Sequence, residues 1–107
     1  MSLAVAKDAA TVRVFHDMMR EYSADVAWVD GTEMMSTGSW HCVSYGAACP
    51  AIPWLSGEPN SSNENCVCLW LGHPAQDDGV NDCTCTESMP FICEYNLHGV
   101  LQRQSSM

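Results

Sequence analysis

Three polar clusters in the second half of the sequence have the residue types of a Ca²⁺ site. They are Glu58-Pro59-Asn60, Glu64-Asn65 and Asn81-Asp82, and each contains a carboxylate and a side-chain amide on loop-like sequence. Carboxylate and amide oxygens are hard donors, and Ca²⁺ takes about six to eight oxygens in flexible geometry. If the loops that carry them are brought together, five side chains are available as ligands: Glu58, Asn60, Glu64, Asn81 and Asp82.

Cysteines directly follow two of these clusters and could bring the loops together. Cys66 and Cys68 lie on one face of a predicted strand, as do Cys83 and Cys85. For the pairs Cys66–Cys85 and Cys68–Cys83 the residue numbers add to 151 in both cases. Opposing residues of an antiparallel ladder have such a constant sum, so one strand pairing could carry both bridges.

The number of cysteines indicates a disulfide scaffold. Seven cysteines in 107 residues are typical of proteins from an oxidising compartment, so we expect a secreted or extracellular protein. Cys42 and Cys49 can close a small loop, and Cys93 is then left as a free thiol or an intermolecular bridge. A zinc site is the alternative use of the Cys-x-Cys pairs, although zinc motifs usually have Cys-x-x-Cys spacing.

Length and charge limit the classes of function. A chain of 107 residues forms one domain, 1–107, with a small core. Its formal net charge of −9 argues against binding to nucleic acid or to anionic membranes. No apolar run approaches the ~20 residues of a membrane span, so we expect no membrane insertion. Residues 1–10 lack the features of a signal peptide, which suggests a fragment or a leader replaced by Met.

The elements that must position these residues can be predicted from local patterns. Val12, Phe15, Met19 and Tyr22 recur at helical spacing after the potential N-cap Asp8, which predicts a helix over residues 9–22. His16 lies beside this apolar stripe and is expected at its boundary with solvent. Asp77 and Asp78 are expected as solvated turn residues. Strands are predicted at 3–5, 26–29, 66–71, 80–84 and 91–95, with loops at 40–53, 55–65 and 72–79 and a flexible tail at 96–107.

The stretch from Trp54 to Glu94 resembles the C-terminal half of a C-type lectin domain. It contains W-x-x-G-E-P-N, E-N-C, N-D-x-x-C and P-F-I-C-E in the order and spacing of that family. The resemblance implies an α+β, C-type lectin-like fold with small antiparallel sheets, one or two helices, a long calcium-binding loop region and disulfide staples. It also implies that Cys66–Cys85 is the family's bridge, with Cys68–Cys83 as an addition. The implied ligands of one Ca²⁺ are Glu58, Asn60, Glu64, Asn81 and Asp82.

The first half resembles the family less closely. Trp28-Val29-Asp30-Gly31 and Gly38-Ser39-Trp40 keep the family's spacing, although the first of these could instead match a later W-x-D-G. Val80 replaces the family's Trp before Asn-Asp. The resemblance implies that the chain starts after the family's first strand and helix, and so after the cysteine that would bridge to Cys93. A second Ca²⁺ is not predicted, because its carboxylates are missing.

The resemblance implies a calcium-dependent carbohydrate-binding module. The Glu-Pro-Asn order goes with mannose, glucose, N-acetylglucosamine or fucose rather than galactose, and the sugar-contacting residues are Glu58, Asn60, Glu64 and Asn81. The alternative is the same fold binding a protein or mineral surface without sugar. No catalytic motif is present, so we do not expect an enzyme. The domain is expected to act as an oligomer or within a larger parent protein.

Overall fold

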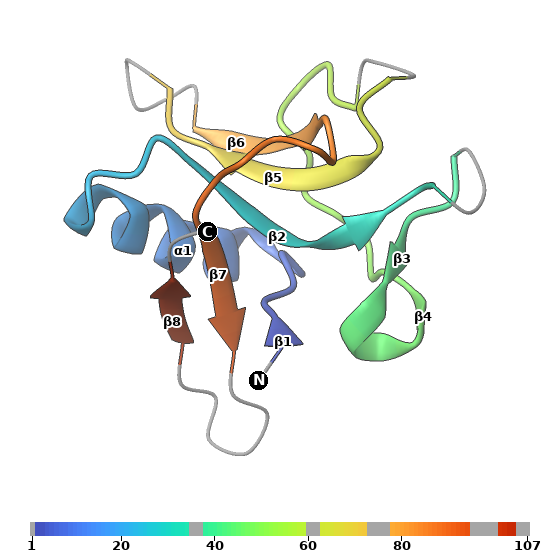
Figure 1. Cartoon of the computed structure of the whole chain (residues 1–107), viewed down its shortest axis with the longest axis horizontal. Helices are drawn as coiled ribbons and strands as arrows, with labels where there is room; N and C mark the ends of the chain where they lie inside the picture. Colours follow the sequence, from blue (N-terminus) through green and yellow to red (C-terminus); the bar gives the residue numbers. More distant parts are fainter. Residues whose placement is uncertain (1, 35–37, 60–62, 73–77, 95–100, 105–107) are drawn as a thin grey trace.

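The computed structural model describes residues 2–34, 38–59, 63–72, 78–94 and, by backbone alone, 101–104. Over these described residues the fold consists of an α-helix, a short 3₁₀ helix and a mixed sheet (Figure 1). No described helix has the length and apolar character needed to cross a bilayer. The elements are β1 (Ser2–Leu3), α1 (Ala9–Glu21), β2 (Val26–Thr32), β3 (His41–Cys42), η1 (Val43–Tyr45), β4 (Ala47–Ala48), β5 (Cys66–Trp70), β6 (Gly79–Cys83), β7 (Phe91–Glu94) and β8 (Leu101–Gln104).

Strand β2 is the centre of the sheet. It pairs antiparallel with β5 and β3, and parallel with β7 at Trp28 and Phe91. Strand β5 continues to β6, β7 lies between β1 and β8, and β3 continues to β4. In Figure 1 the β5–β6 pair lies on one side of β2, and β1, β7 and β8 lie on the other. Helix α1 is beside one end of β2, and the β3–β4 hairpin extends from the other end.

Helix α1 forms where its cap and apolar stripe predict it. The Asp8 carboxylate accepts a hydrogen bond from the Thr11 backbone N–H at 2.8 Å, which satisfies one of the free donors of the first turn. Val12, Phe15 and Met19 are buried and form one core with Ala27, Val29, Val67, Leu69, Val80 and Ile92. This core joins the helix to β2, β5, β6 and β7, so it fixes the strands that carry the predicted ligands.

His16 differs from its predicted place at the boundary with solvent. Only 5 % of its surface is exposed. Its ring lies beside the backbone of Trp70 and Gly79, which pair at the end of the β5–β6 pair. Sequence periodicity does not include that tertiary contact.

All three predicted disulfides are present: Cys42–Cys49, Cys66–Cys85 and Cys68–Cys83. The predicted register is wrong by two residues. Cys66 lies opposite Cys83 and Cys68 lies opposite Asn81, so opposing residue numbers add to 149 instead of 151. Each bridge therefore joins diagonal neighbours, with Cα–Cα distances of 5.2 and 5.9 Å. These distances lie within the ordinary range for disulfides, so the pairing of cysteines does not by itself determine the strand register.

Two stretches expected to be irregular contain strands. Residues 40–53 were expected to form a stapled loop, and within them the Cys42–Cys49 bridge encloses η1 and β4. Residues Leu101–Gln104, expected to belong to a flexible tail, form β8 and pair with β7. Pairing with β8 satisfies the backbone N–H and C=O groups on this edge of β7. The polar sequence of residues 101–104 does not indicate this pairing.

Candidate metal centre

The segment that carries Glu58 runs along the outer edge of β6. The Leu55 N–H donates to the Val80 carbonyl at 3.0 Å, and the Glu58 N–H donates to the Leu55 carbonyl at 2.8 Å. The second bond closes a turn in which Gly57 has φ +88°, a left-handed conformation that favours glycine. The peptide bond between Glu58 and Pro59 is cis. In the described sheet β6 pairs only with β5, so its other edge is free to receive this turn.

The close approach of this segment depends on Gly79. A Cβ atom added at Gly79 would lie 2.5 Å from the Leu55 Cβ, which is closer than side chains tolerate. Glycine at the start of β6 therefore allows Leu55 to pack against the strand. The consequence is that Glu58 is held beside the residues that follow Gly79 on β6.

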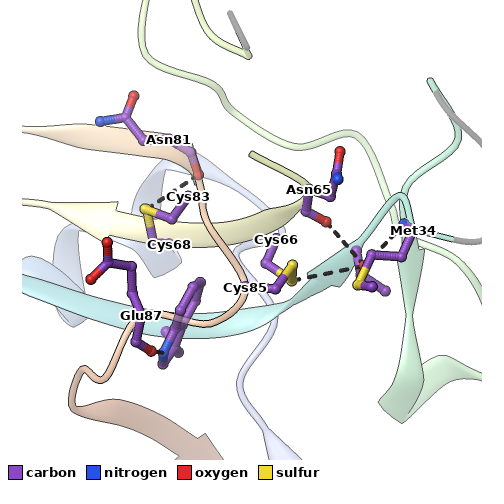
Figure 2. Close-up of a disulfide and its surroundings, with 10 residues drawn as sticks. Met34, Asn65, Cys66, Cys68, Asn81, Cys83, Cys85 and Glu87 are labelled. Atoms are coloured by element: carbon purple, nitrogen blue, oxygen red, sulfur yellow. Dashed lines mark hydrogen bonds between the residues drawn. A yellow bond between two sulfur atoms is a disulfide. The ribbon is translucent and has the colours of Figure 1, made fainter. Parts of the chain in front are cut away.

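Asn81 and Asp82 are successive residues of β6 and so point to opposite faces of the sheet. Asp82 is opposite Val67 on the core face and is only 4 % exposed. Asn81 is opposite Cys68, and Figure 2 shows its amide pointing away from the sulfur of Cys68. The Cys68 Sγ lies 3.5 Å from the Asn81 backbone oxygen, which is a packing contact because a disulfide sulfur carries no hydrogen.

The Asn81 amide has an unmet hydrogen-bonding requirement. Its Oδ1 is buried and has no hydrogen-bond partner among the described residues. A buried acceptor without a partner destabilises a fold by about 1–3 kcal/mol. A cation bound at Oδ1 would satisfy this atom, so Asn81 fits the role of a metal ligand.

The carboxyl groups of Asp82 and Glu64 lie near that of Glu58. Removal of water from around Glu58, a hydrogen bond with the Asp82 carboxyl group and the negative charges of Asp82 and Glu64 raise the pKa of Glu58 from 4.5 to about 7. A hydrogen bond between two carboxyl groups requires a shared proton. Without a cation, a proton shared between Glu58 and Asp82 therefore offsets part of the negative charge of the site.

Glu64 is positioned just before the start of β5. The backbone oxygen of the next residue, Asn65, accepts hydrogen bonds from the Thr32 hydroxyl at 3.0 Å and from the Glu33 N–H at 2.9 Å. These bonds tie the start of β5 to the end of β2. In Figure 2 the side chains of Asn65 and Asn81 point to the same side of the β5–β6 pair, away from the two disulfides.

The structure thus places Asp82 and Glu64 near Glu58 and places Asn81 next to Asp82 on β6, whereas Asn60 lies outside the described residues. Among the described residues, no group of three His, Cys, Asp or Glu side chains has the spacing of a closed metal site. The carboxylates are close enough to shift the pKa of Glu58 without yet being arranged around one point. Their chemistry fits Ca²⁺, because every candidate donor is an oxygen.

Zinc does not fit the same region. Thiolates are the ligands that the Cys-x-Cys alternative requires. The structure places Cys66, Cys68, Cys83 and Cys85 in disulfides, so none of them can ligate zinc. Cys93 is the free cysteine and is buried.

Two acids have structural roles that the sequence did not predict. The buried Asp30 carboxylate accepts hydrogen bonds from the backbone N–H groups of Val43 and Ser44, both at 2.8 Å, and from the Ser44 hydroxyl. This holds η1 onto β2. Asp78, expected to be a solvated turn residue, instead forms an ion pair with Arg20 and accepts a hydrogen bond from the Gly72 N–H at 3.0 Å. No local pattern predicts either contact, because the partners are distant in sequence or belong to loop backbone.

Comparisons with known proteins show the family of the chain. The family described as Lectin C-type domain matches residues 2–95. C-type lectin 37Db of Drosophila melanogaster is 31 % identical over 71 residues, which are 64 % of this chain and 46 % of that protein. C-type lectin lectoxin-Enh2 of Pseudoferania polylepis and a C-type lectin of Cerberus rynchops are each 48 % identical over 46 residues, or 41 % of this chain. The matched regions cover 40 % and 28 % of those two proteins, so the chain spans less than half the length of these relatives.

Proposed function

Because this chain belongs to the C-type lectin domain family, we propose that it is a calcium-dependent carbohydrate-binding module. The proposed ligands of the ion are Glu58, Asn60, Glu64, Asn81 and Asp82. The observation that carries the proposal is the placing of Asp82 and Glu64 beside Glu58, whose pKa is raised to about 7 by loss of surrounding water and then by these two acids. The buried, unpartnered Oδ1 of Asn81 on the same edge of β6 supports it.

The chemistry of sugar binding follows from the donors in this set. Ca²⁺ bound with open coordination positions would accept two vicinal hydroxyl groups of a sugar. Glu58 and Glu64 accept hydrogen bonds from those hydroxyls, and the amides of Asn60 and Asn81 donate to them. Recognition therefore depends on the order of acceptors and donors around the sugar.

We infer that the sugar belongs to the mannose, glucose, N-acetylglucosamine and fucose class. The Glu58-Pro59-Asn60 order supports this, because in the family it goes with these sugars rather than with galactose. The double variant Glu58→Gln with Asn60→Asp introduces a donor at position 58 and replaces the donor at position 60 by an acceptor. The double variant should shift preference towards galactose.

The proposal is tested by titration with Ca²⁺ followed by a glycan array with and without chelator. We expect saturable Ca²⁺ binding and mannose-type binding that chelator abolishes. Glu58→Gln should lose both, whereas Glu21→Gln, which removes an exposed acid on α1, should keep both. Sugar binding that survives chelation would refute the calcium mechanism.

The same fold could instead bind a protein or mineral surface. Exposed apolar side chains on η1 favour this second function, since Val43 is 81 % and Tyr45 is 52 % exposed. It would be supported by a native protein that binds Ca²⁺ but no glycan on the array. For either function the three disulfides support a secreted protein. The family generally consists of binding modules, and we propose no catalytic role.

A further inference from the structure

A cavity of about 480 Å³ lies between α1 and the loop that leads to the candidate metal centre. Residues at helical spacing on α1, including Val12, Arg13, His16 and Arg20, form one wall. The Pro53–Ser56 segment forms the opposite wall. The volume is within the ~300–1,000 Å³ of sites for small molecules. None of the four described residues proposed as calcium ligands lines this cavity.

His16 contributes a buried polar atom to the helix wall. The residue is 95 % buried, and its Nε2 has no hydrogen-bond partner among the described residues. Burial lowers the pKa of the imidazole, although the nearby carbonyls of Gly79 and Trp70 partly oppose this effect. The ring is therefore neutral near pH 7, and in the tautomer with a hydrogen on Nε2 it can donate one hydrogen bond.

Arg13 supplies a positive charge on the same side of the helix, three residues from His16. It has neither an ion pair nor a hydrogen bond within the described residues of the chain. Arg20 differs, because its guanidinium is already paired with Asp17 and Asp78. Asp78 is therefore neutralised, and Arg13 is the cation of this wall that remains available.

The part of the chain around α1 does not share the net charge of −9. Three of the four basic residues, Lys7, Arg13 and Arg20, lie on α1 or directly before it and balance the three acids of residues 7–21, Asp8, Asp17 and Glu21. The opposite wall is largely apolar, with Pro53, Trp54 and Leu55. A ligand that matches both walls carries one negative group and an apolar body.

We propose that this cavity binds a small amphipathic monocarboxylate. Its carboxylate is held by the Arg13 guanidinium, which pairs well with planar carboxylates, and by the His16 Nε2–H. Its apolar body packs against Trp54 and Leu55. This site requires no calcium, so it is independent of the proposed sugar-binding function.

The test is an NMR titration of the whole chain with three probes in the presence of chelator. Phenylacetate carries both the ring and the charge, phenylacetamide carries the ring alone, and glucuronate carries the charge on a polar body. We expect phenylacetate to bind about tenfold or more tightly than either of the others, from the strength of hydrogen bonds to a charged group. It should also shift the indole N–H signal of Trp54.

Arg13→Gln and Lys7→Gln form a matched pair of variants, because each removes one exposed positive charge and only Arg13 lines the cavity. Arg13→Gln should weaken phenylacetate binding about tenfold, whereas Lys7→Gln should change it less than about twofold. An equal loss in both variants would show a general effect of charge and overturn the site. Equal binding of glucuronate, or no saturable binding of phenylacetate, would also overturn it.

Discussion

At Glu58, the raised pKa has a consequence for stability without calcium. In the folded state the Glu58 carboxyl group keeps its proton up to about pH 7, whereas its ordinary pKa is 4.5. Glu58 therefore contributes to the stability of the fold at low pH. That contribution is complete below pH 4.5 and is lost as the pH rises through about 7. We predict that the thermal midpoint of the calcium-free protein falls over this window more in the native chain than in Glu58→Gln. Parallel profiles for the two proteins would contradict the assignment.

Asp82 should respond in opposite ways with and without calcium. Asp82→Asn keeps a group that can hydrogen-bond to Glu58 but removes one of three converging negative charges. Without Ca²⁺ we expect unfolding midpoints equal to or above those of the native chain, because repulsion is relieved. Ca²⁺ affinity should fall by about tenfold or more, since it depends on the charge of the ligands. Calorimetry and thermal unfolding of one preparation measure both effects.

Asp77 provides the comparison for the placement of the ion. It is a neighbour in sequence but is not a proposed ligand, and it lies outside the described residues. Asp77→Ala should therefore weaken Ca²⁺ binding far less than Asp82→Ala, as measured by calorimetry at one pH. The reverse order would mean that the site is wrongly placed.

At the scale of elements, the contact between β6 and the Leu55–Glu58 turn links packing to metal binding. Gly79→Ala would place a Cβ 2.5 Å from Leu55, and overpacking of this kind costs about 1–3 kcal/mol. The turn must move away from β6 to relieve the contact, which carries Glu58 away from Asp82. We predict a lower unfolding midpoint and a weaker Ca²⁺ affinity together. If Gly79→Ala is destabilised but binds Ca²⁺ with unchanged affinity, the position of the turn does not determine Ca²⁺ binding.

The elements also show what the sequence can and cannot predict. Helix α1 was predictable because the Asp8 cap and the spacing of Val12, Phe15 and Met19 are local signals. The disulfide pairs were predictable, but the β5–β6 register was not, since diagonal cysteines can also be bridged. The proximity of Glu58, Glu64 and Asp82, which are distant in sequence, was expected only through the family's motifs. The burial of His16 depends on a contact between α1 and distant strands, which no local pattern contains.

At the scale of the whole molecule, three disulfides and one buried thiol define the covalent structure. Burial raises the pKa of the Cys93 thiol, so the native protein should react slowly with thiol reagents. After denaturation without reduction, we expect one reactive thiol per chain. A larger number would mean that one of the three bridges does not form. Peptide mapping that joins Cys66 to Cys93 would contradict the pairing directly.

Calcium should stabilise the whole domain, because its proposed ligands come from segments that are distant in sequence and meet only in the folded state. Glu58 belongs to the turn after Trp54, Glu64 precedes β5, and Asp82 is on β6. An ion that binds only the folded chain stabilises it by mass action, by about 2.7 kcal/mol at a hundredfold excess over the dissociation constant. For a domain near 100 residues this corresponds to roughly 10–20 °C in the unfolding midpoint.

Protons compete with the ion for the same oxygens, so this stabilisation and any mannose-type binding should weaken as the pH falls. Ordinary carboxylates would place the loss at about pH 4–5. Because the pKa of Glu58 is about 7, the loss of Ca²⁺ binding should begin closer to neutral pH. Unfolding midpoints measured with Ca²⁺ and with chelator should therefore differ most above pH 7 and converge in acid. A difference that stays constant from about pH 5 to about pH 8 would show that Glu58 does not ligate the ion.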